Sequence, residues 1–305
     1  MAETIRGNFR SVTGQELEKR LWPAEGQPKA VVQFVHGMAE HIDRYDAPAK
    51  ALNQAGFIVV GHTHLGHGQN AVVKGYFAEN DGWDALIEDT NALRRETQAQ
   101  YPALPYFLLG HSMGSFLTRT YLIKHPDKYD GVILSGTGHQ SPALVLGGNA
   151  AASVMAKLNG AMGNGTKLDS LAFGTYLNKI ENPRTKFDWL SRDTEQVDKY
   201  IADPLCGFVG KIGLYRDMMQ GIKFITDKKN IAQMNKEKPV YFMSGDGDPV
   251  GDYGKGVERA YKAFCDAGLH DVFMRLYPGG RHEMLNETNK EQVYQDILNW
   301  LNEKI

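Results

Sequence analysis

Cysteine is scarce in this chain of 305 residues, which contains only Cys206 and Cys265. The two lie far apart in sequence and lack the spacing of metal-binding cysteines, so neither a disulfide framework nor a cysteine-based zinc site is indicated. We expect two free thiols in a reducing compartment. Because residues 1–6 contain no apolar signal segment, we also expect a cytoplasmic location.

Long apolar runs and an excess of one charge are missing as well. No uncharged apolar segment reaches the roughly 18 residues that a membrane-spanning helix needs. Lys and Arg together number 34 against 36 Asp and Glu, which leaves a formal net charge of −2. With no basic surface indicated, we predict no nucleic-acid partner. The length suits one large domain or a domain with an insertion.

Short apolar runs alternate with amphipathic segments in both halves of the chain. Strands are predicted at residues 5–12, 17–22, 30–35, 57–60, 105–109, 131–134, 239–243 and 272–277, and helices at 45–55, 83–100, 115–125, 255–267 and 287–301. Such alternation predicts an α/β fold, with a mostly parallel central sheet covered by helices on both faces. Ligands of such folds bind beyond the C-terminal ends of the strands.

Residues 139–209 interrupt this alternation. The stretch 141–166 is rich in Gly, Ala, Met and Asn, and Lys157 is its only charged residue. An excursion of this length without internal structure is uncommon in a compact domain. We therefore predict a helical cap over the strand ends at 139–209, inserted between the core segments 1–138 and 210–305.

The pentapeptide Gly-His-Ser-Met-Gly at residues 110–114 lies between a predicted strand and a predicted helix. Strand, G-x-S-x-G and helix in this order indicate a nucleophile elbow, in which a sharp turn exposes the serine hydroxyl. Ser112 is thus the predicted nucleophile. The alternative is that Ser112 is an ordinary helix N-cap, a position that serine favours.

A serine nucleophile needs a base to accept its proton and an acid to orient that base. In this fold the chain order is Ser, then Asp or Glu, then His, and the turns after the last two predicted strands supply Asp248 and His282 in that order. His282 is the expected base. Asp246 is a second candidate for the acid, but we favour Asp248 because Asp246 is placed to cap the turn.

The oxyanion of an acyl-transfer intermediate needs backbone N–H donors. One donor is expected on the residue after the nucleophile, Met113, and the other in the loop after an earlier strand. The segment His36-Gly37-Met38 occupies that place, so Met38 is the predicted second donor.

These motifs resemble the alpha/beta-hydrolase superfamily and, within it, the monoacylglycerol lipase and lysophospholipase group. Residues 36–45 resemble the H-G-x-x-E-H-x-x-R-Y segment of that group, and residues 64–68 resemble its H-x-G-H-G loop. Thr63 and Ser115 depart from its frequent residues, and the cap is much less similar. The resemblance implies hydrolysis of a carboxylic ester with a lipid-like acyl chain through an acyl-Ser112 intermediate, without a metal or organic cofactor.

The apolar residues of the predicted cap indicate a surface for the acyl group, since flexible methionine suits such binding. We predict substrate contacts from Met155, Leu158 and Met162. A partly exposed apolar cap also predicts transient contact with membranes or micelles.

Three other functions are compatible with parts of the pattern. A proline-iminopeptidase-like aminopeptidase shares the fold and triad and would need cap carboxylates for a substrate amine, for which the chain offers Glu181, Asp188, Asp193 and Glu195. A zinc hydrolase is suggested by His62, His64 and His67, but Gly66 occupies the place of an expected Asp ligand. A non-catalytic binding protein would normally have lost a triad member.

Overall fold

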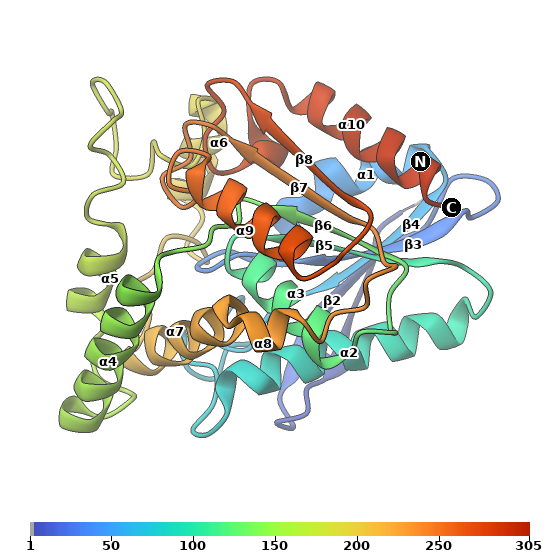
Figure 1. Cartoon of the computed structure of the whole chain (residues 1–305). Helices are drawn as coiled ribbons and strands as arrows, with labels where there is room; N and C mark the ends of the chain where they lie inside the picture. Colours follow the sequence, from blue (N-terminus) through green and yellow to red (C-terminus); the bar gives the residue numbers. More distant parts are fainter. Residues whose placement is uncertain (1–2) are drawn as a thin grey trace.

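The computed structural model describes residues 3–305 and contains an eight-stranded sheet at its centre (Figure 1). Residues 1 and 2, which belong to the expected core segment 1–138 and to the N-terminal stretch without a signal, lie outside the described residues. The sheet order is β1-β2-β4-β3-β5-β6-β7-β8. The strands are β1 (Ile5–Arg10), β2 (Glu16–Trp22), β3 (Ala30–Val35), β4 (Phe57–His62), β5 (Tyr106–His111), β6 (Gly131–Ser135), β7 (Val240–Gly245) and β8 (Val272–Tyr277).

Strands β3 to β8 run parallel, whereas β1 and β2 form an antiparallel hairpin at one edge. Every residue of β3, β4, β5, β6 and β7 is buried. Continuous burial is expected of parallel strands covered on both faces. From β3 the chain adds β4 on one side and later β5 on the other, which opens a crevice at the C-terminal ends of β3 and β5.

Helices cover both faces of the sheet and create two separate apolar cores. On one face lie α1 (Asp46–Gln54) and α10 (Lys290–Glu303). The other face is covered by α2 (Gly82–Gln100), α3 (Met113–Lys124), α7 (Ile212–Thr226), α8 (Lys228–Ile231) and α9 (Lys255–Asp266). Short 3₁₀ turns at Ile42–Tyr45 (η1) and Met284–Asn286 (η2) precede α1 and α10. The predicted α/β fold, with a mostly parallel sheet between two helical layers, is confirmed.

Between β6 and α7 the chain forms α4 (Pro142–Asn159), α5 (Thr166–Phe173) and α6 (Thr194–Ala202). Figure 1 shows α4 and α5 projecting beyond one end of the sheet. Helix α4 packs against α7, which in turn packs against α2 and α3 of the sheet layer. Across residues 3–305, no helix is long and apolar enough to cross a membrane.

Several elements differ from the sequence-based expectation, and the differences at α10 and α7 are the largest. Helix α10 begins at Lys290 rather than at 287, because the Glu287 side chain is buried and accepts hydrogen bonds from the N–H groups of Arg192, Arg281 and Thr288. Helix α7 was not predicted. Its N-cap residue makes no side-chain capping bond, but apolar residues at positions 212, 215, 218, 222 and 225 follow the helical period that would have revealed it.

Candidate active site

Ser112 occupies a sharp turn between β5 and α3. Its φ of 55° and ψ of −122° lie outside the regions that most residues with a side chain adopt. The turn is held by a 2.9 Å hydrogen bond from the Ser112 N–H to the Ser135 carbonyl of β6. A Cβ on Gly114 would overlap the Val35 carbonyl, and one on Gly110 would overlap Thr118. The glycines of the pentapeptide are therefore required by close backbone approach.

His282 and Asp248 meet at the C-terminal ends of β7 and β8. His282 Nδ1 lies 2.9 Å from Asp248 Oδ2, and both side chains are almost fully buried. The other carboxylate oxygen of Asp248 accepts the Val250 N–H at 2.9 Å, and Ser244 Oγ lies 3.3 Å from Oδ2. This carboxylate is thus fixed in orientation and can hold the His282 ring in one tautomer.

Asp246 has a different role from Asp248, although the two are separated by a single residue. Its side chain is exposed and accepts the Gly279 N–H at 2.6 Å. This bond ties the turn after β7 to the turn that precedes His282. The structure thus gives Asp246 a turn-stabilising contact and brings only Asp248 to the imidazole.

Burial disfavours the protonated form of His282, but the neighbouring carboxylate favours it. Burial lowers the pKa of His282, but the Asp248 charge and hydrogen bond outweigh it and raise the pKa above 6.5. The Trp189 ring, from the segment between α5 and α6, lies 5.1 Å from the imidazole between ring centroids. The His111 ring packs on it at 4.7 Å, and burial, with His282 nearby, lowers the pKa of His111 to about 4. His111 therefore stays neutral beside a base that can become charged.

The loop after β3 lies against the nucleophile. A Cβ on Gly37 would come 3.1 Å from the Ser112 Cβ, which shows how closely this loop approaches the serine. The Gly37 N–H donates to Glu40 at 2.6 Å and the Ala39 N–H donates to His67 Nε2 at 3.1 Å. Within residues 3–305, the N–H groups of Met38 and Met113 have no hydrogen-bond partner. Both main-chain donors are therefore free to bind an oxyanion.

A buried ion network joins this loop to the histidine turn. Arg44 donates to both carboxylate oxygens of Glu283 at 2.7 Å and to Glu40 at 2.6 Å. Burial alone would raise the pKa of Glu283, but Arg44 lowers it to about 2. Glu283 follows His282 directly, and Glu40 holds Gly37. Arg44 thus links the two loops that must stay in register around Ser112.

Four buried imidazoles lie around the loop after β3: His36, His62, His64 and His67. His36 Nε2 accepts the His64 N–H at 2.9 Å, as His67 accepts that of Ala39. Burial lowers the pKa of His67 to about 4 and that of His62 to about 3. His64 Nε2 in turn lies 3.2 Å from the His36 carbonyl oxygen, and His64 Nδ1 lies 3.3 Å from His62 Nε2. Because these ring nitrogens are already hydrogen-bonded to the loop or to one another, the arrangement does not fit the zinc-ligand role considered from the sequence.

A family model described as "Serine aminopeptidase, S33" matches residues 26–289 of the chain. The chain belongs to this alpha/beta-hydrolase family. It is 28% identical to the monoacylglycerol lipase of Mycolicibacterium smegmatis over 96% of this chain and 95% of that protein. It is also 28% identical to the monoglyceride lipase of Rattus norvegicus, over 96% and 88% of the respective chains.

A solved structure of a thermostable carboxyl esterase from Bacillus coagulans, in complex with glycerol, matches with a TM-score of 0.91. It is 31% identical and covers 99% of both chains. The family match and these relatives place the protein among serine hydrolases of the esterase and monoacylglycerol lipase type.

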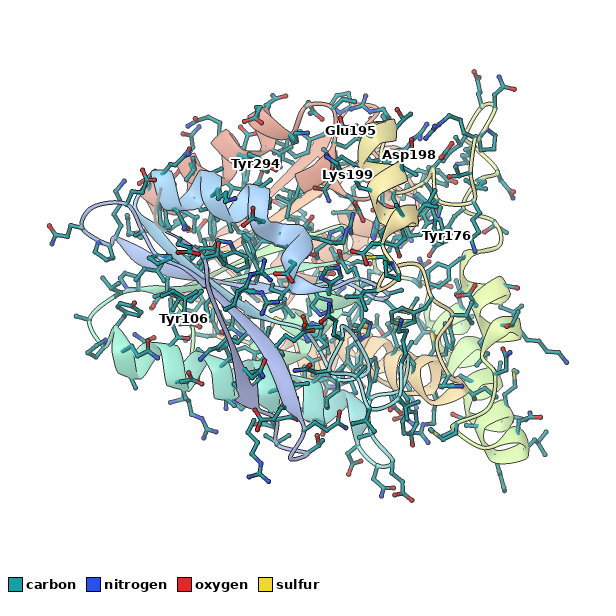
Figure 2. All side chains as sticks on the ribbon, turned by 180° about the vertical axis from the view of Figure 1, so that it is seen from behind. Tyr106, Tyr176, Glu195, Asp198, Lys199 and Tyr294 are labelled. Atoms are coloured by element: carbon teal, nitrogen blue, oxygen red, sulfur yellow. The ribbon has the colours of Figure 1, made fainter. Side chains whose placement is uncertain are left out.

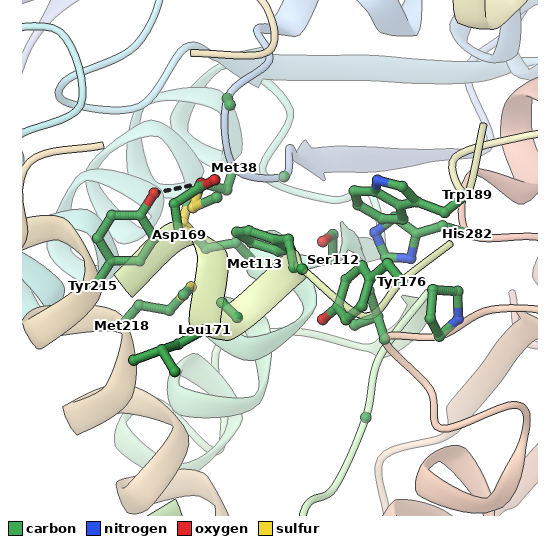
Figure 3. Close-up of a pocket in the computed structure, with 18 of the residues that line it drawn as sticks. Met38, Ser112, Met113, Asp169, Leu171, Tyr176, Trp189, Tyr215, Met218 and His282 are labelled. Carbon is green, nitrogen blue, oxygen red and sulfur yellow. Dashed lines mark hydrogen bonds between the residues drawn. The ribbon is translucent and has the colours of Figure 1, made fainter. Parts of the chain in front are cut away.

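In this alpha/beta hydrolase, Ser112 and His282 open into one cavity of about 990 Å3 (Figure 3). On one side of Ser112 the cavity runs between α4, α5 and α7, where its walls are mainly apolar: Met38, Met113, Phe116, Val145, Gly148, Ala152, Leu168, Met218, Met219 and Ile222. On the other side lie His282, Trp189 and Tyr176. We call these the apolar arm and the histidine side.

The cavity does not reach Met155, Leu158 and Met162, which the sequence predicted as substrate contacts. None of the three lines the cavity, Leu158 is 77% exposed, and Met155 packs against the sheet-layer core. Helix α4 instead presents its small residues to the cavity, including Gly147, Gly148, Ala151 and Ala152. The chain pattern showed that α4 is apolar but not which face of the helix turns inward.

One further group of metal-ligand types occurs within the described residues. Atoms of His41, Asp203 and Cys206 lie within 4.8 Å of one another. His41 Nε2 is already hydrogen-bonded to Asp203 at 2.8 Å. Burial raises the pKa of the Cys206 thiol far above its usual range, whereas a metal binds the thiolate. The contact therefore fits a hydrogen bond that anchors the segment after α6 beside the loop after β3.

Proposed function

We propose that this protein cleaves carboxylic esters through an acyl-Ser112 intermediate, and that its substrates resemble monoacylglycerols or lysophospholipids. The single observation that carries the proposal is the arrangement of Ser112 on a strained elbow, with the His282–Asp248 pair opening into the same largely apolar cavity. We also propose that residues 139–209 act as a cap that supplies one wall of the apolar arm, through α4 and α5.

The groups at the site account for each bond and proton of such a cycle. His282 accepts the Ser112 proton as Oγ attacks the ester carbon, and Asp248 stabilises the imidazolium. The N–H groups of Met38 and Met113 bind the oxyanion. As the C–O bond breaks, His282 passes the proton to the leaving alcohol. Water then attacks the acyl carbon and gives one proton to His282. The bond between that carbon and Ser112 Oγ breaks, His282 returns the proton to Oγ, and the carboxylic acid leaves.

The lipid-like acyl group is supported by the walls of the apolar arm and by the surface of the cap. Large apolar side chains on α4 and α5 are exposed to solvent, among them Leu144, Leu146, Val154, Leu158 and Leu171. An exposed apolar patch of this kind is suited to transient contact with a membrane or micelle surface. The relatives named as monoacylglycerol and monoglyceride lipases favour the same substrate class.

The test is turnover of p-nitrophenyl esters from acetate to palmitate by the wild type and by Ser112→Ala. We expect turnover by the wild type and a loss of about 10⁴- to 10⁶-fold in the variant, with unchanged circular dichroism. Near wild-type activity in the variant contradicts the proposal, as does a folded wild type that cleaves no ester of the series.

An aminopeptidase is the second candidate, because the family model carries that description. The four cap carboxylates suggested from sequence do not line the cavity: Glu181, Asp188, Asp193 and Glu195. Asp193 caps α6, and Asp188 accepts the Arg184 N–H. Figure 2 shows Glu195 at the outside of α6, where it pairs with Lys199. Faster cleavage of an aminoacyl p-nitroanilide than of any ester would favour this candidate.

A further inference from the structure

Four tyrosines line the cavity, and they differ in what their hydroxyl groups bind. The Tyr200 hydroxyl donates to the Ala39 carbonyl at 3.0 Å, and the Tyr215 hydroxyl donates to Asp169 at 2.7 Å. Within residues 3–305, the hydroxyls of Tyr176 and Tyr253 have no such partner. A polar group left unpaired in a largely apolar cavity is a candidate for binding ligand.

Tyr176 is held on the histidine side of Ser112 by aromatic contacts. Its ring meets Trp189 edge-on with centroids 5.0 Å apart, and Phe173 in the same way at 5.3 Å. Trp189 packs directly on His282. Figure 3 shows Tyr176 beside Ser112 and His282, opposite the apolar arm with Tyr215, Leu171 and Met218. Burial raises the pKa of Tyr176 far above neutrality, so the hydroxyl remains a donor.

The proposed reaction decides which part of the substrate Tyr176 meets. His282 must pass its proton to the departing oxygen, so the alcohol portion of the ester lies on the histidine side. The acyl chain then occupies the apolar arm. We propose that the Tyr176 hydroxyl hydrogen-bonds a free hydroxyl on the alcohol portion and so favours esters of polyols, such as glycerol, over esters of simple alcohols.

This inference rests on the ester hydrolysis proposed above and extends it to the alcohol. The carboxylates on the cavity wall are already bound within the protein. Glu40 and Glu283 are bound to Arg44, and Asp252 is bound to Arg259. Tyr253 has its ring under the Lys179 ammonium, 3.6 Å from the ring centroid. No ring contact joins Tyr253 to Trp189 or His282 among the described residues, and this makes it a matched control.

The experiment compares 1-octanoylglycerol with methyl octanoate, which share the acyl group, below micelle-forming concentrations. Tyr176→Phe keeps the ring contacts and removes only the hydroxyl. We expect kcat/KM for 1-octanoylglycerol to fall about 3- to 10-fold, mainly through KM, as for loss of one neutral hydrogen bond. For methyl octanoate we expect a change below about 2-fold. Tyr253→Phe should leave the ratio of the two substrates near that of the wild type.

Two results would overturn the role of Tyr176. One is an equal fall for both substrates, which indicates a structural effect or an acyl-side contact, and the other is no change for either. A shift of the ratio in Tyr253→Phe alone would transfer the role to that residue. If the folded wild type cleaves neither ester, the proposed function itself fails. That outcome is distinct from a wild type active on both esters with an unchanged ratio in the variant.

Discussion

The sheet core and the segment 139–209 differ in how completely their residues are buried. In the core, five consecutive neighbouring strands are buried at every residue, and the buried charged groups of Arg44, Glu283 and Asp248 are paired. In α4, only Val145 and Ala152 are buried over 18 residues, and several large apolar side chains face solvent. Packing in the core therefore fixes the positions of its side chains, whereas α4 exposes apolar surface both to the cavity and to solvent.

This difference separates the groups proposed to react with the substrate from the surface proposed to choose it. The proposed nucleophile, base and acid come from three turns of the core, where dense packing limits their movement. Much of the apolar arm comes from α4 and α5, which reach the core mainly through their packing against α7. Changes in the core should therefore affect rate and stability together, while changes in α4 should affect which substrate is accepted.

The sharpest contrast within the core concerns its two neighbouring carboxylates. Asp248→Asn should lower kcat by about 10⁴-fold, since the amide favours the wrong tautomer of His282. Asp246→Asn keeps an oxygen acceptor for the Gly279 N–H and should lose less than about 10-fold, because only a turn contact is altered. Steady-state kinetics with a p-nitrophenyl ester measures both. The opposite ranking would assign the acid to Asp246.

Ion pairs should behave differently in the two regions. Arg44→Ala leaves Glu283 and Glu40 buried without their cation, which should cost about 3–5 kcal/mol of unfolding free energy. Arg184→Ala removes a solvent-exposed pair with Asp198 outside the core and should leave the free energy of unfolding nearly unchanged, because solvent screens such a pair. Urea denaturation at pH 7 gives both values. Equal losses in the two variants would show that the buried network does not hold the core loops together.

Acid should weaken the core through its buried imidazoles. Burial lowers the pKa of His67 to about 4 in the folded protein, against 6.5 for an unburied imidazole. As the pH falls, the unfolded state therefore gains the proton first. The contribution of His67 to the free energy of unfolding is fully present above pH 6.5 and is lost as the pH falls from 6.5 to 4. Between pH 7 and pH 5 this loss is about 2 kcal/mol. In His67→Gln, urea midpoints measured at both pH values should differ less than in the wild type.

An exposed histidine provides the control for this pH dependence. His270 is largely exposed, so His270→Gln should retain the wild-type difference between the two urea midpoints. If His67→Gln is as acid-sensitive as the wild type, the buried imidazole is not responsible for the acid loss.

The smallest expected effect compares the two faces of α4. A Cβ at Gly148 would lie 2.7 Å from Met219 Cε inside the apolar arm, so Gly148→Leu should shorten the arm. We expect kcat/KM for p-nitrophenyl palmitate to fall about 10-fold or more relative to acetate. Leu158→Ser, on the exposed face, should leave the chain-length profile of dissolved esters unchanged. A profile altered only by Leu158→Ser would place the acyl group on the outer face.

Much of the fold could be predicted from residue patterns because its strands are short, apolar and regularly separated by helices. The strand at 30–35 and the helix at 83–100 match β3 and α2 within one residue. Helix α10 began later than predicted because the buried Glu287 binds backbone N–H groups from another segment. Such a long-range contact leaves no local mark in the sequence.

For the candidate site, the order of motifs along the chain indicated Ser112, Asp248 and His282, and the structure places all three at one end of the sheet. The positions of Tyr176 and Trp189 in the cavity wall could not be predicted, because their segment has no regular pattern. Likewise, the apolar character of α4 is visible in the sequence, but its inward face depends on packing against α7.

The sequence by itself determined the chemistry. The elbow glycines, the ordered Asp and His turns and the loop after β3 are local requirements of backbone geometry, and local requirements are visible as motifs. The tertiary structure alone decided the shape of the cavity, the pairing of Arg44 with Glu283 and the position of Tyr176 beside His282. These depend on contacts between segments far apart in the chain, and no local residue pattern specifies such contacts.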